Sequence, residues 1–171
     1  MKTSLIFLTG LMGAGKTTLG RLLARELGAD FCDMDAEIVL REGREIPELF
    51  ARGEAVFRDA ETHACRALCR RKNLVVACGG GAILREENVQ MMRGAGAIVF
   101  LDRPVENILG DVDPSNRPLL AQGRERLLAI RDARDSLYRA SADCIVKNDS
   151  SQQEGLNRLL QAVQSIWEAE K

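Results

Sequence analysis

The stretch Thr9-Gly10-Leu11-Met12-Gly13-Ala14-Gly15-Lys16-Thr17-Thr18 decides the fold, because residues 10–17 fit the phosphate-binding pattern G-x-x-x-x-G-K-[ST]. The apolar run Leu5-Ile6-Phe7-Leu8 precedes it, as expected of a buried parallel strand. Leucines at positions 19, 22, 23 and 27 follow at helical spacing, and Gly28 is placed to end that helix. Strand, glycine-rich turn and helix therefore occur in the order that a phosphate-binding loop needs.

These residues predict a site for a nucleoside triphosphate. Glycines let backbone N–H groups approach an anion closely, and the following helix points its positive end at the same place. In this pattern Lys16 adds a positive charge at the β- and γ-phosphates, and the Thr17 hydroxyl is a ligand for Mg²⁺.

The bulk composition is that of an ordinary globular chain. Its 171 residues suit a single domain, 46% of them are hydrophobic and 29% charged, and the formal net charge is −1. A nearly neutral chain predicts no nucleic-acid partner, and its short apolar runs predict no membrane span. We expect a cytoplasmic monomer. The five cysteines form no C-x-x-C pair and we expect them to be small buried hydrophobic residues, while the single histidine, His63, is expected at the surface.

Strands and helices alternate along the chain, which predicts an α/β fold with a parallel sheet. We expect strands over 4–9, 31–35, 74–78, 97–101 and 143–147, and helices over 16–27, 36–42, from Pro47, and over 54–72, 85–93, 104–110, 124–139 and 152–169. Residues 111–123 form a long polar segment rich in turn residues, and such segments are often lids over active sites.

An acidic pair and a triple glycine follow the second and third predicted strands. The carboxyl ends of parallel strands share one edge of the sheet, so Asp33, Asp35 and Gly79-Gly80-Gly81 should lie near the phosphate loop. In an extended segment one aspartate can face Mg²⁺ while the other faces the phosphate acceptor. The alternative is that the pair only caps the following helix.

Two pairs of residues can bind or stabilise an anion. Arg58 lies three residues before Glu61 on a predicted helix, and an arginine held by a carboxylate suits a carboxylate substrate, although a surface ion pair has the same spacing. Arg117 lies in the predicted lid, where it could close over the transferring phosphate, and Arg134, with Leu137-Tyr138 after it, offers a second cation near the last helix.

Taken together, these motifs resemble the shikimate kinase family. The resemblance runs collinearly from about residue 5 to 148 and is carried by the phosphate loop, Asp33-Met34-Asp35, Phe57-Arg58 with Glu61, Gly79-Gly80-Gly81, Asn116-Arg117-Pro118-Leu119-Leu120 and Arg134-x-x-Leu137-Tyr138. It implies a P-loop three-layer α/β/α fold with a five-stranded parallel sheet of order 2-3-1-4-5, a lid at 111–123 and a substrate-binding helical segment at 33–61.

The resemblance also implies a reaction, in which the γ-phosphate of ATP passes to the 3-hydroxyl of shikimate. It assigns ATP to Gly13, Ala14, Gly15, Lys16, Thr17, Thr18 and Arg117, Mg²⁺ to Thr17 and Asp33, and shikimate to Asp35, Arg58, Gly80 and Arg134. Lys16, Asp35 and Arg117 would be the catalytic residues, with Asp35 a candidate acceptor for the proton of the attacking hydroxyl.

The sequence departs from the family pattern in three places. Gly110 stands where members usually carry an arginine that packs on adenine, the late adenine loop reads Lys147-Asn148-Asp149-Ser150-Ser151, and Glu45 stands where a serine or threonine cap is common. The first two changes concern nucleotide binding, Glu45 precedes the substrate-binding helix, and none of the three touches the phosphate-transfer residues. Two other functions fit the same motifs, a gluconate kinase-like polyhydroxy-acid kinase and a nucleotide-binding module without turnover.

Overall fold

The computed structural model describes residues 4–111 and 117–170, with side chains described from residue 123 onward in the second range. The elements are β1 (Leu5–Thr9), α1 (Lys16–Leu27), β2 (Asp30–Asp33), α2 (Met34–Glu42), α3 (Ile46–Ala51), α4 (Glu54–Leu68), β3 (Leu74–Ala77), the 3-10 turn η1 (Ala82–Leu84), α5 (Glu86–Ala95), β4 (Ala97–Asp102), α6 (Val105–Gly110), α7 (Arg117–Ser141), β5 (Cys144–Lys147) and α8 (Gln152–Ala169).

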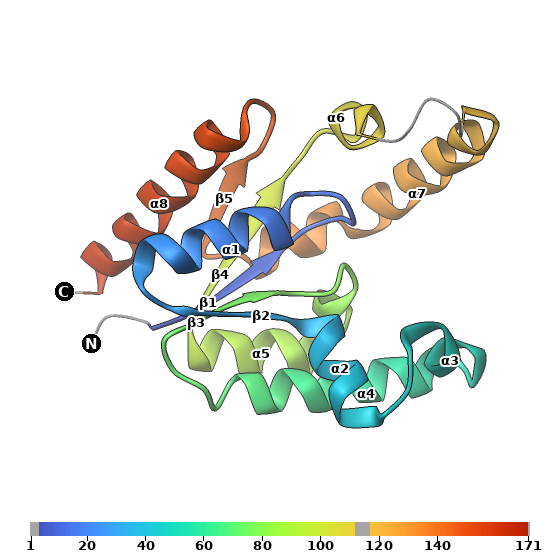
Figure 1. Cartoon of the computed structure of the whole chain (residues 1–171), viewed down its shortest axis with the longest axis horizontal. Coiled ribbons are helices and arrows are strands. Elements are labelled where there is room, and N and C mark those ends of the chain that lie inside the picture. Colours follow the sequence, from blue (N-terminus) through green and yellow to red (C-terminus); the bar gives the residue numbers. More distant parts are fainter. Residues whose placement is uncertain (1–3, 112–116, 171) are drawn as a thin grey trace.

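The strands form one parallel sheet of order β2-β3-β1-β4-β5, which confirms the expected topology (Figure 1). β1 lies at its centre, where Leu5 is paired with Leu74 of β3 and Ile6 with Ala97 of β4. All five residues of β1 are buried, as a strand covered on both faces requires.

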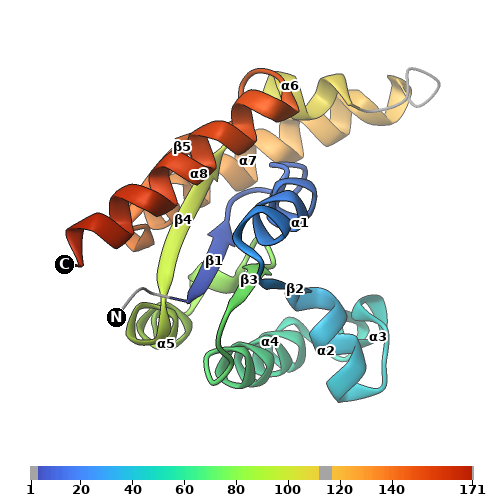
Figure 2. The same ribbon diagram turned by 60° about the vertical axis from the view of Figure 1, so that its left-hand side comes forward.

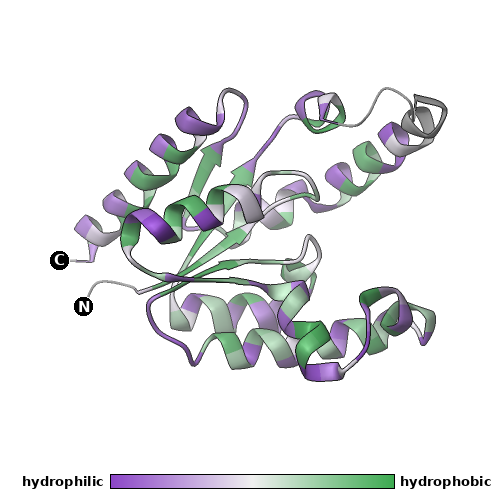
Figure 3. Ribbon diagram, in the orientation of Figure 1, coloured by the Kyte–Doolittle hydropathy of each residue, from purple (hydrophilic) through white to green (hydrophobic). Residues whose placement is uncertain are grey.

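Helices cover both faces of the sheet, and alternate residues of β1 point into the two layers. Leu5 and Phe7 join the core beneath α4, α5 and α7, whereas Ile6 and Leu8 join the core beneath α1 and α8. Figure 2 shows α1 and α8 together on one side of the strands, and the hydropathy colouring of Figure 3 shows apolar strands between helices with polar outer faces.

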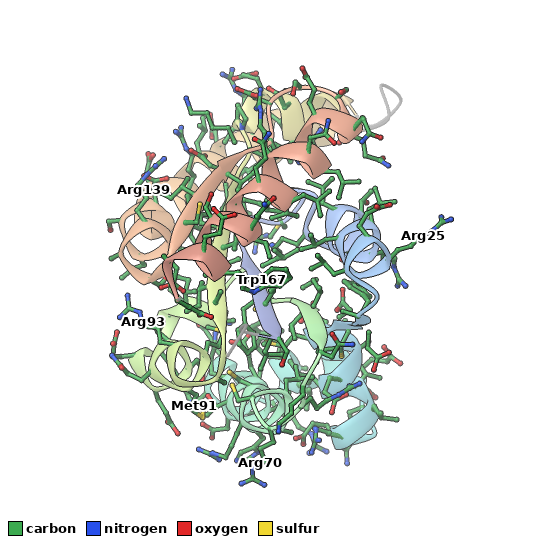
Figure 4. The ribbon with its side chains drawn as sticks, turned by 90° about the vertical axis from the view of Figure 1, so that its left-hand side faces the viewer. Arg25, Arg70, Met91, Arg93, Arg139 and Trp167 are labelled. Atoms are coloured by element: carbon green, nitrogen blue, oxygen red, sulfur yellow. The ribbon has the colours of Figure 1, made fainter. Side chains whose placement is uncertain are left out.

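The carboxyl ends of the strands all point to one end of the molecule. In Figure 1 this is the right-hand end, from which α3 and the start of α7 project, while both termini lie at the left. Figure 4 views the terminal end, where Arg70 and Arg25 extend outward and Trp167 of α8 packs against the core. Among the described residues, no helix is both long and apolar enough to cross a bilayer.

Two boundaries near the predicted site residues were wrong. α7 begins at Arg117 rather than near 124, so the backbone of 117–123 is helical and does not belong to a loop as expected. A proline in the first helical turn removes no helical hydrogen bond, so Pro118 is compatible with this start. α2 begins at Met34, which places Asp35 in a helix rather than in the extended segment that we expected.

Candidate active site

The phosphate loop forms the floor of a cavity of about 380 Å³ at the carboxyl edge of the sheet. Gly15 has φ 97°, a conformation that favours glycine, and caps the start of α1. The cavity is lined by residues 12–18 of the loop together with Asp33, Asp35, Ala77, Cys78, Gly79, Gly80, Arg103 and Asp111. The residues predicted to bind the phosphates, Gly13 to Thr18, therefore line one space.

Lys16 lies folded back over this loop. Its Nζ donates hydrogen bonds to the carbonyl oxygen of Gly10 and, at 2.8 Å, to that of Leu11. Burial lowers the pKa of the Lys16 ammonium from its ordinary 10.5 to about 8, against the opposing effect of nearby Asp35 and Asp33. An anion entering the cavity would favour the charged form of this lysine.

Asp33 combines the two alternatives that the sequence left open. Its Oδ1 accepts a hydrogen bond of 2.9 Å from the backbone N–H of Asp35, so the side chain caps α2. Its Oδ2 accepts a hydrogen bond of 3.0 Å from the Thr17 hydroxyl. One carboxylate thus starts a helix and places a second oxygen beside the phosphate loop.

Asp35 lies where this cavity meets a second one. It lines both spaces, together with Met12, Gly79 and Gly80. Burial and then the Asp33 carboxylate raise the pKa of Asp35 above its ordinary 3.8, while Lys16 and Arg58 act in the opposite direction. A carboxylate with a raised pKa between two cavities is suitably placed to accept a proton from a group in either one.

The second cavity, of about 580 Å³, is walled by α4 and α7. It is lined by Met12, Asp35, Ile46, Phe50, Glu54, Phe57, Arg58, Glu61, Gly79, Gly80, Gly81, Arg126, Ile130 and Arg134. We call it the acceptor cavity and the first one the nucleotide cavity. Its three arginines come from two helices, and Arg58 and Arg134 were both predicted to meet here.

A buried ion pair holds Arg58. Its Nη1 lies 2.8 Å from Oε1 of Glu61, whose side chain is only 1% exposed, and its Nε lies 3.5 Å from the more exposed Glu54. Burial raises the pKa of Glu61 above its ordinary 4.5, and the hydrogen bond from Arg58 opposes this. The pair is therefore a fixed wall of the cavity and not the surface ion pair that the spacing also allowed.

The three glycines after β3 let side chains approach the backbone. A Cβ at Gly81 would collide with the Arg58 guanidinium, and one at Gly80 would lie 3.6 Å from Nη1 of Arg134. The Gly80 carbonyl accepts a hydrogen bond from the hydroxyl of Tyr138, a nearly fully buried residue of α7 that stacks on Phe100. This contact ties the triple glycine to the helix that carries Arg134.

The remaining expectations have mixed outcomes. The side chain of Arg117 lies outside the described residues, as do the other side chains of 112–122 in the expected lid. His63 is exposed and Cys65 and Cys78 are buried, as expected, whereas Cys32, Cys69 and Cys144 are only partly buried. In the described part of the chain, no group of three or more His, Cys, Asp or Glu residues could hold a metal ion.

Two arginines that line the cavities, Arg126 and Arg103, were missed in the sequence. Arg126 faces the acceptor cavity with Ile130 and Arg134, and their four-residue spacing on one helix was the available signal. Arg103 lines the nucleotide cavity immediately after β4, where the rule that ligands gather at carboxyl ends of strands could have indicated it.

The comparisons with known proteins point to one family. The sequence profile described as shikimate kinase matches residues 12–164. A shikimate kinase of Clostridium beijerinckii is 45% identical over 149 residues, which cover 87% of this chain and 88% of that protein. The solved shikimate kinase from Acinetobacter baumannii in complex with shikimate is 39% identical with a TM-score of 0.85, covering 95% of this chain and 93% of that one.

A more distant relative shares the architecture alone. The gluconokinase from Sinorhizobium meliloti superposes with a TM-score of 0.64 at 19% identity, covering 98% of this chain and 95% of that one. At that identity the likeness concerns the fold and not the substrate. The profile and the relatives at or above 39% identity show that the chain belongs to the shikimate kinase family.

Proposed function

We propose that the nucleotide cavity and the acceptor cavity hold the two substrates of one phosphoryl transfer, with Asp35 between them. As a member of its family, the chain is an ATP-dependent kinase that transfers the γ-phosphate of ATP to shikimate, giving shikimate 3-phosphate and ADP. The observation that carries the residue assignment is that Asp35 lines both cavities.

In the nucleotide cavity, the backbone N–H groups from Gly13 to Thr18 would bind the phosphates at the positive end of α1. Lys16 would exchange its backbone carbonyl partners for phosphate oxygens. Phosphoryl transfer needs positioning and charge neutralisation more than covalent chemistry, and this loop supplies both.

The chain's own oxygen atoms fit Mg²⁺. The Thr17 hydroxyl and the Asp33 carboxylate lie 3.0 Å apart beside the phosphate loop, and a hydroxyl with a carboxylate is the hard donor set that this ion prefers. When bound with ATP, Mg²⁺ would neutralise phosphate charge. Thr17 and Asp33 would hold it, and Asp33 would at the same time keep the start of α2 in place.

In the acceptor cavity, Arg58 and Arg134 would bind the shikimate carboxylate from opposite helices, and the backbone at Gly80 would lie along the ring. The buried contact with Glu61 keeps the Arg58 guanidinium in one orientation, which suits recognition of a planar carboxylate. Asp35 would bind the ring hydroxyls and accept the proton of the attacking 3-hydroxyl.

Arg117 would act from the lid on the transferring phosphate, and closure of the lid over both cavities would exclude water. We also propose that the chain works as a single-domain monomer in the cytoplasm. The role of Arg117 is supported by the family resemblance and by its position at the start of α7.

The experiment that tests the proposal measures ADP release from Mg·ATP with shikimate, gluconate or a nucleoside monophosphate as acceptor. We expect stimulation by shikimate alone, and its loss in Lys16→Ala. Stimulation by gluconate would instead assign the acceptor cavity to a polyhydroxy acid. ATP binding with no transfer to any acceptor would support a nucleotide-binding module.

The role of Asp35 is tested separately with Asp35→Asn. Loss of turnover with shikimate affinity retained would support proton acceptance by this carboxylate. Loss of shikimate binding would show that Asp35 mainly positions the acceptor.

A further inference from the structure

Arg103 follows β4 and reaches the phosphate loop from the side opposite Asp33. Its Nη1 donates a hydrogen bond of 2.8 Å to the carbonyl oxygen of Gly13 and lies 2.6 Å from Oδ2 of Asp111, directly after α6. The Arg103 side chain is 19% exposed and that of Asp111 is 66% exposed, and both residues line the nucleotide cavity. A half-buried guanidinium therefore lies in the space assigned to the phosphates.

The guanidinium still has donors to offer. Arginine carries five N–H donors, and among the described residues the hydrogen bonds of Arg103 both use Nη1. Its carboxylate partner is exposed, and an exposed ion pair contributes little to stability, so a phosphate group can replace it. The hydrogen bond to the Gly13 carbonyl remains when the contact with Asp111 breaks, and it keeps the guanidinium beside the phosphate loop.

The position of Arg103 bears on one departure of the sequence from the family pattern, the glycine at position 110. Gly110 carries no side chain toward the nucleotide, and a Cβ placed there would meet no atom within 4 Å. Arg103 lies at the other end of α6, and it is paired with the residue that follows Gly110. It therefore places a cation in the cavity that Gly110 cannot provide.

We propose that Arg103 is a nucleotide-binding residue that donates to the phosphate chain of ATP, and that Asp111 is an internal competitor which holds its guanidinium until the nucleotide enters. Asp111 lowers the affinity for nucleotide, because its contact with Arg103 must be broken. Its own pKa is lowered by the hydrogen bond from Arg103, so the competitor is ionised at neutral pH. The inference rests on the assignment of the first cavity to ATP.

Opposite effects of two substitutions test the proposal. Arg103→Gln should weaken the binding of ADP and of inorganic tripolyphosphate alike, by about tenfold or more, as expected for hydrogen bonds to a charged group. Asp111→Asn should tighten both by about two- to fivefold, because only an exposed ion pair is lost. The KM for shikimate should change in neither variant, and Arg103→Lys should recover part of the lost affinity.

A matched control pair lies outside both cavities. Arg66 of α4 and Glu87 of α5 are exposed and also lie 2.6 Å apart, so Arg66→Gln and Glu87→Gln make the same charge changes elsewhere. Isothermal titration of wild type and the four Gln or Asn variants, with thermal denaturation of each, should show altered binding only for Arg103 and Asp111.

Several results would overturn the proposal. If Asp111→Asn weakened binding as Arg103→Gln does, the pair would be a structural brace for the loop. If Arg103→Gln weakened ADP but not tripolyphosphate, the guanidinium would act on the base or ribose. Wild-type protein that binds neither ADP nor tripolyphosphate would refute the assignment of the cavity itself, which distinguishes that failure from a failure of Arg103.

Discussion

The nucleotide cavity and the acceptor cavity lie side by side but are built in different ways. The first is made mainly by the backbone of one continuous stretch, residues 12–18, around which a few side chains gather. The second is made mainly by side chains from α3, α4 and α7, together with the backbone of the glycines after β3. A backbone site needs only one correct local conformation, whereas a side-chain site needs several elements packed correctly.

The difference predicts how each cavity responds to substitution. Substitutions in the acceptor cavity should change the affinity for the acceptor alone, because each arginine there would bind it through its own side chain. Changes around the phosphate loop should act on the nucleotide through the loop's conformation. The following substitutions separate the two, in order of decreasing expected effect.

The largest effect is expected for Arg117→Ala, which removes the cation that we propose acts on the transferring phosphate from the lid. A cation on the transferring phosphate can contribute about 10³–10⁵ in rate, so turnover should fall steeply with both KM values little changed. Steady-state kinetics would measure this, and near-wild-type turnover would remove Arg117 from the mechanism.

The next effect concerns the acceptor cavity alone. Arg58→Ala and Arg134→Ala should each raise the KM for shikimate by about ten- to a hundredfold, the range for losing hydrogen bonds to a charged group. The KM for ATP should stay the same. Arg66→Ala, an exposed arginine of α4 outside both cavities, is the control. An equal rise in both KM values would show that the two cavities are not independent.

A smaller effect, on the KM for ATP, is expected for Asn148, which contacts the phosphate loop. Asn148 follows β5, is 9% exposed, and its Nδ2 donates a hydrogen bond of 2.8 Å to the carbonyl oxygen of Ala14. Asn148→Ala leaves that loop without its partner, which should raise the KM for ATP by roughly tenfold. The KM for shikimate is the internal comparison, and an unchanged KM for ATP would contradict a bracing role.

The smallest effect is expected for Asp35→Asn, on the pH dependence of the free energy of unfolding. Because burial raises the native pKa of Asp35 above 3.8, the native state binds this proton more tightly than the unfolded chain. Ionising Asp35 therefore lowers the free energy of unfolding as the pH rises through the interval between the ordinary and the raised pKa. Asp35→Asn should remove this part of the pH dependence and raise the Tm slightly at pH 7.

Thermal denaturation between pH 4 and pH 8 would measure this change. Asp59→Asn is a suitable control, because Asp59 is an exposed carboxylate of α4 that pairs with Arg85 and lines neither cavity. A Tm for Asp35→Asn that falls at pH 7 would show that the carboxylate stabilises the fold in its charged form.

Most of the nucleotide cavity could be predicted from the sequence, because the residues that form it are neighbours in one short stretch. The order of strand, glycine loop and helix, the parallel sheet and the residues from Gly13 to Thr18 were all readable from spacing. The start of α2 was wrong because a capping aspartate and a strand-end aspartate read alike, and Asp33 is both. The start of α7 was wrong because its first turn contains Pro118 and directly follows the turn residues Asp113-Pro114-Ser115-Asn116 in the sequence.

What the sequence by itself determined is the set of chemical groups and the order in which they follow the strands. Tertiary structure decided which of them meet. Glu61 is buried against Arg58, Arg103 reaches the Gly13 carbonyl from 90 residues away, and Asp35 borders two cavities at once. The physical reason is that parallel strands deliver distant segments to one edge, and only packing fixes the distances and the exclusion of water there.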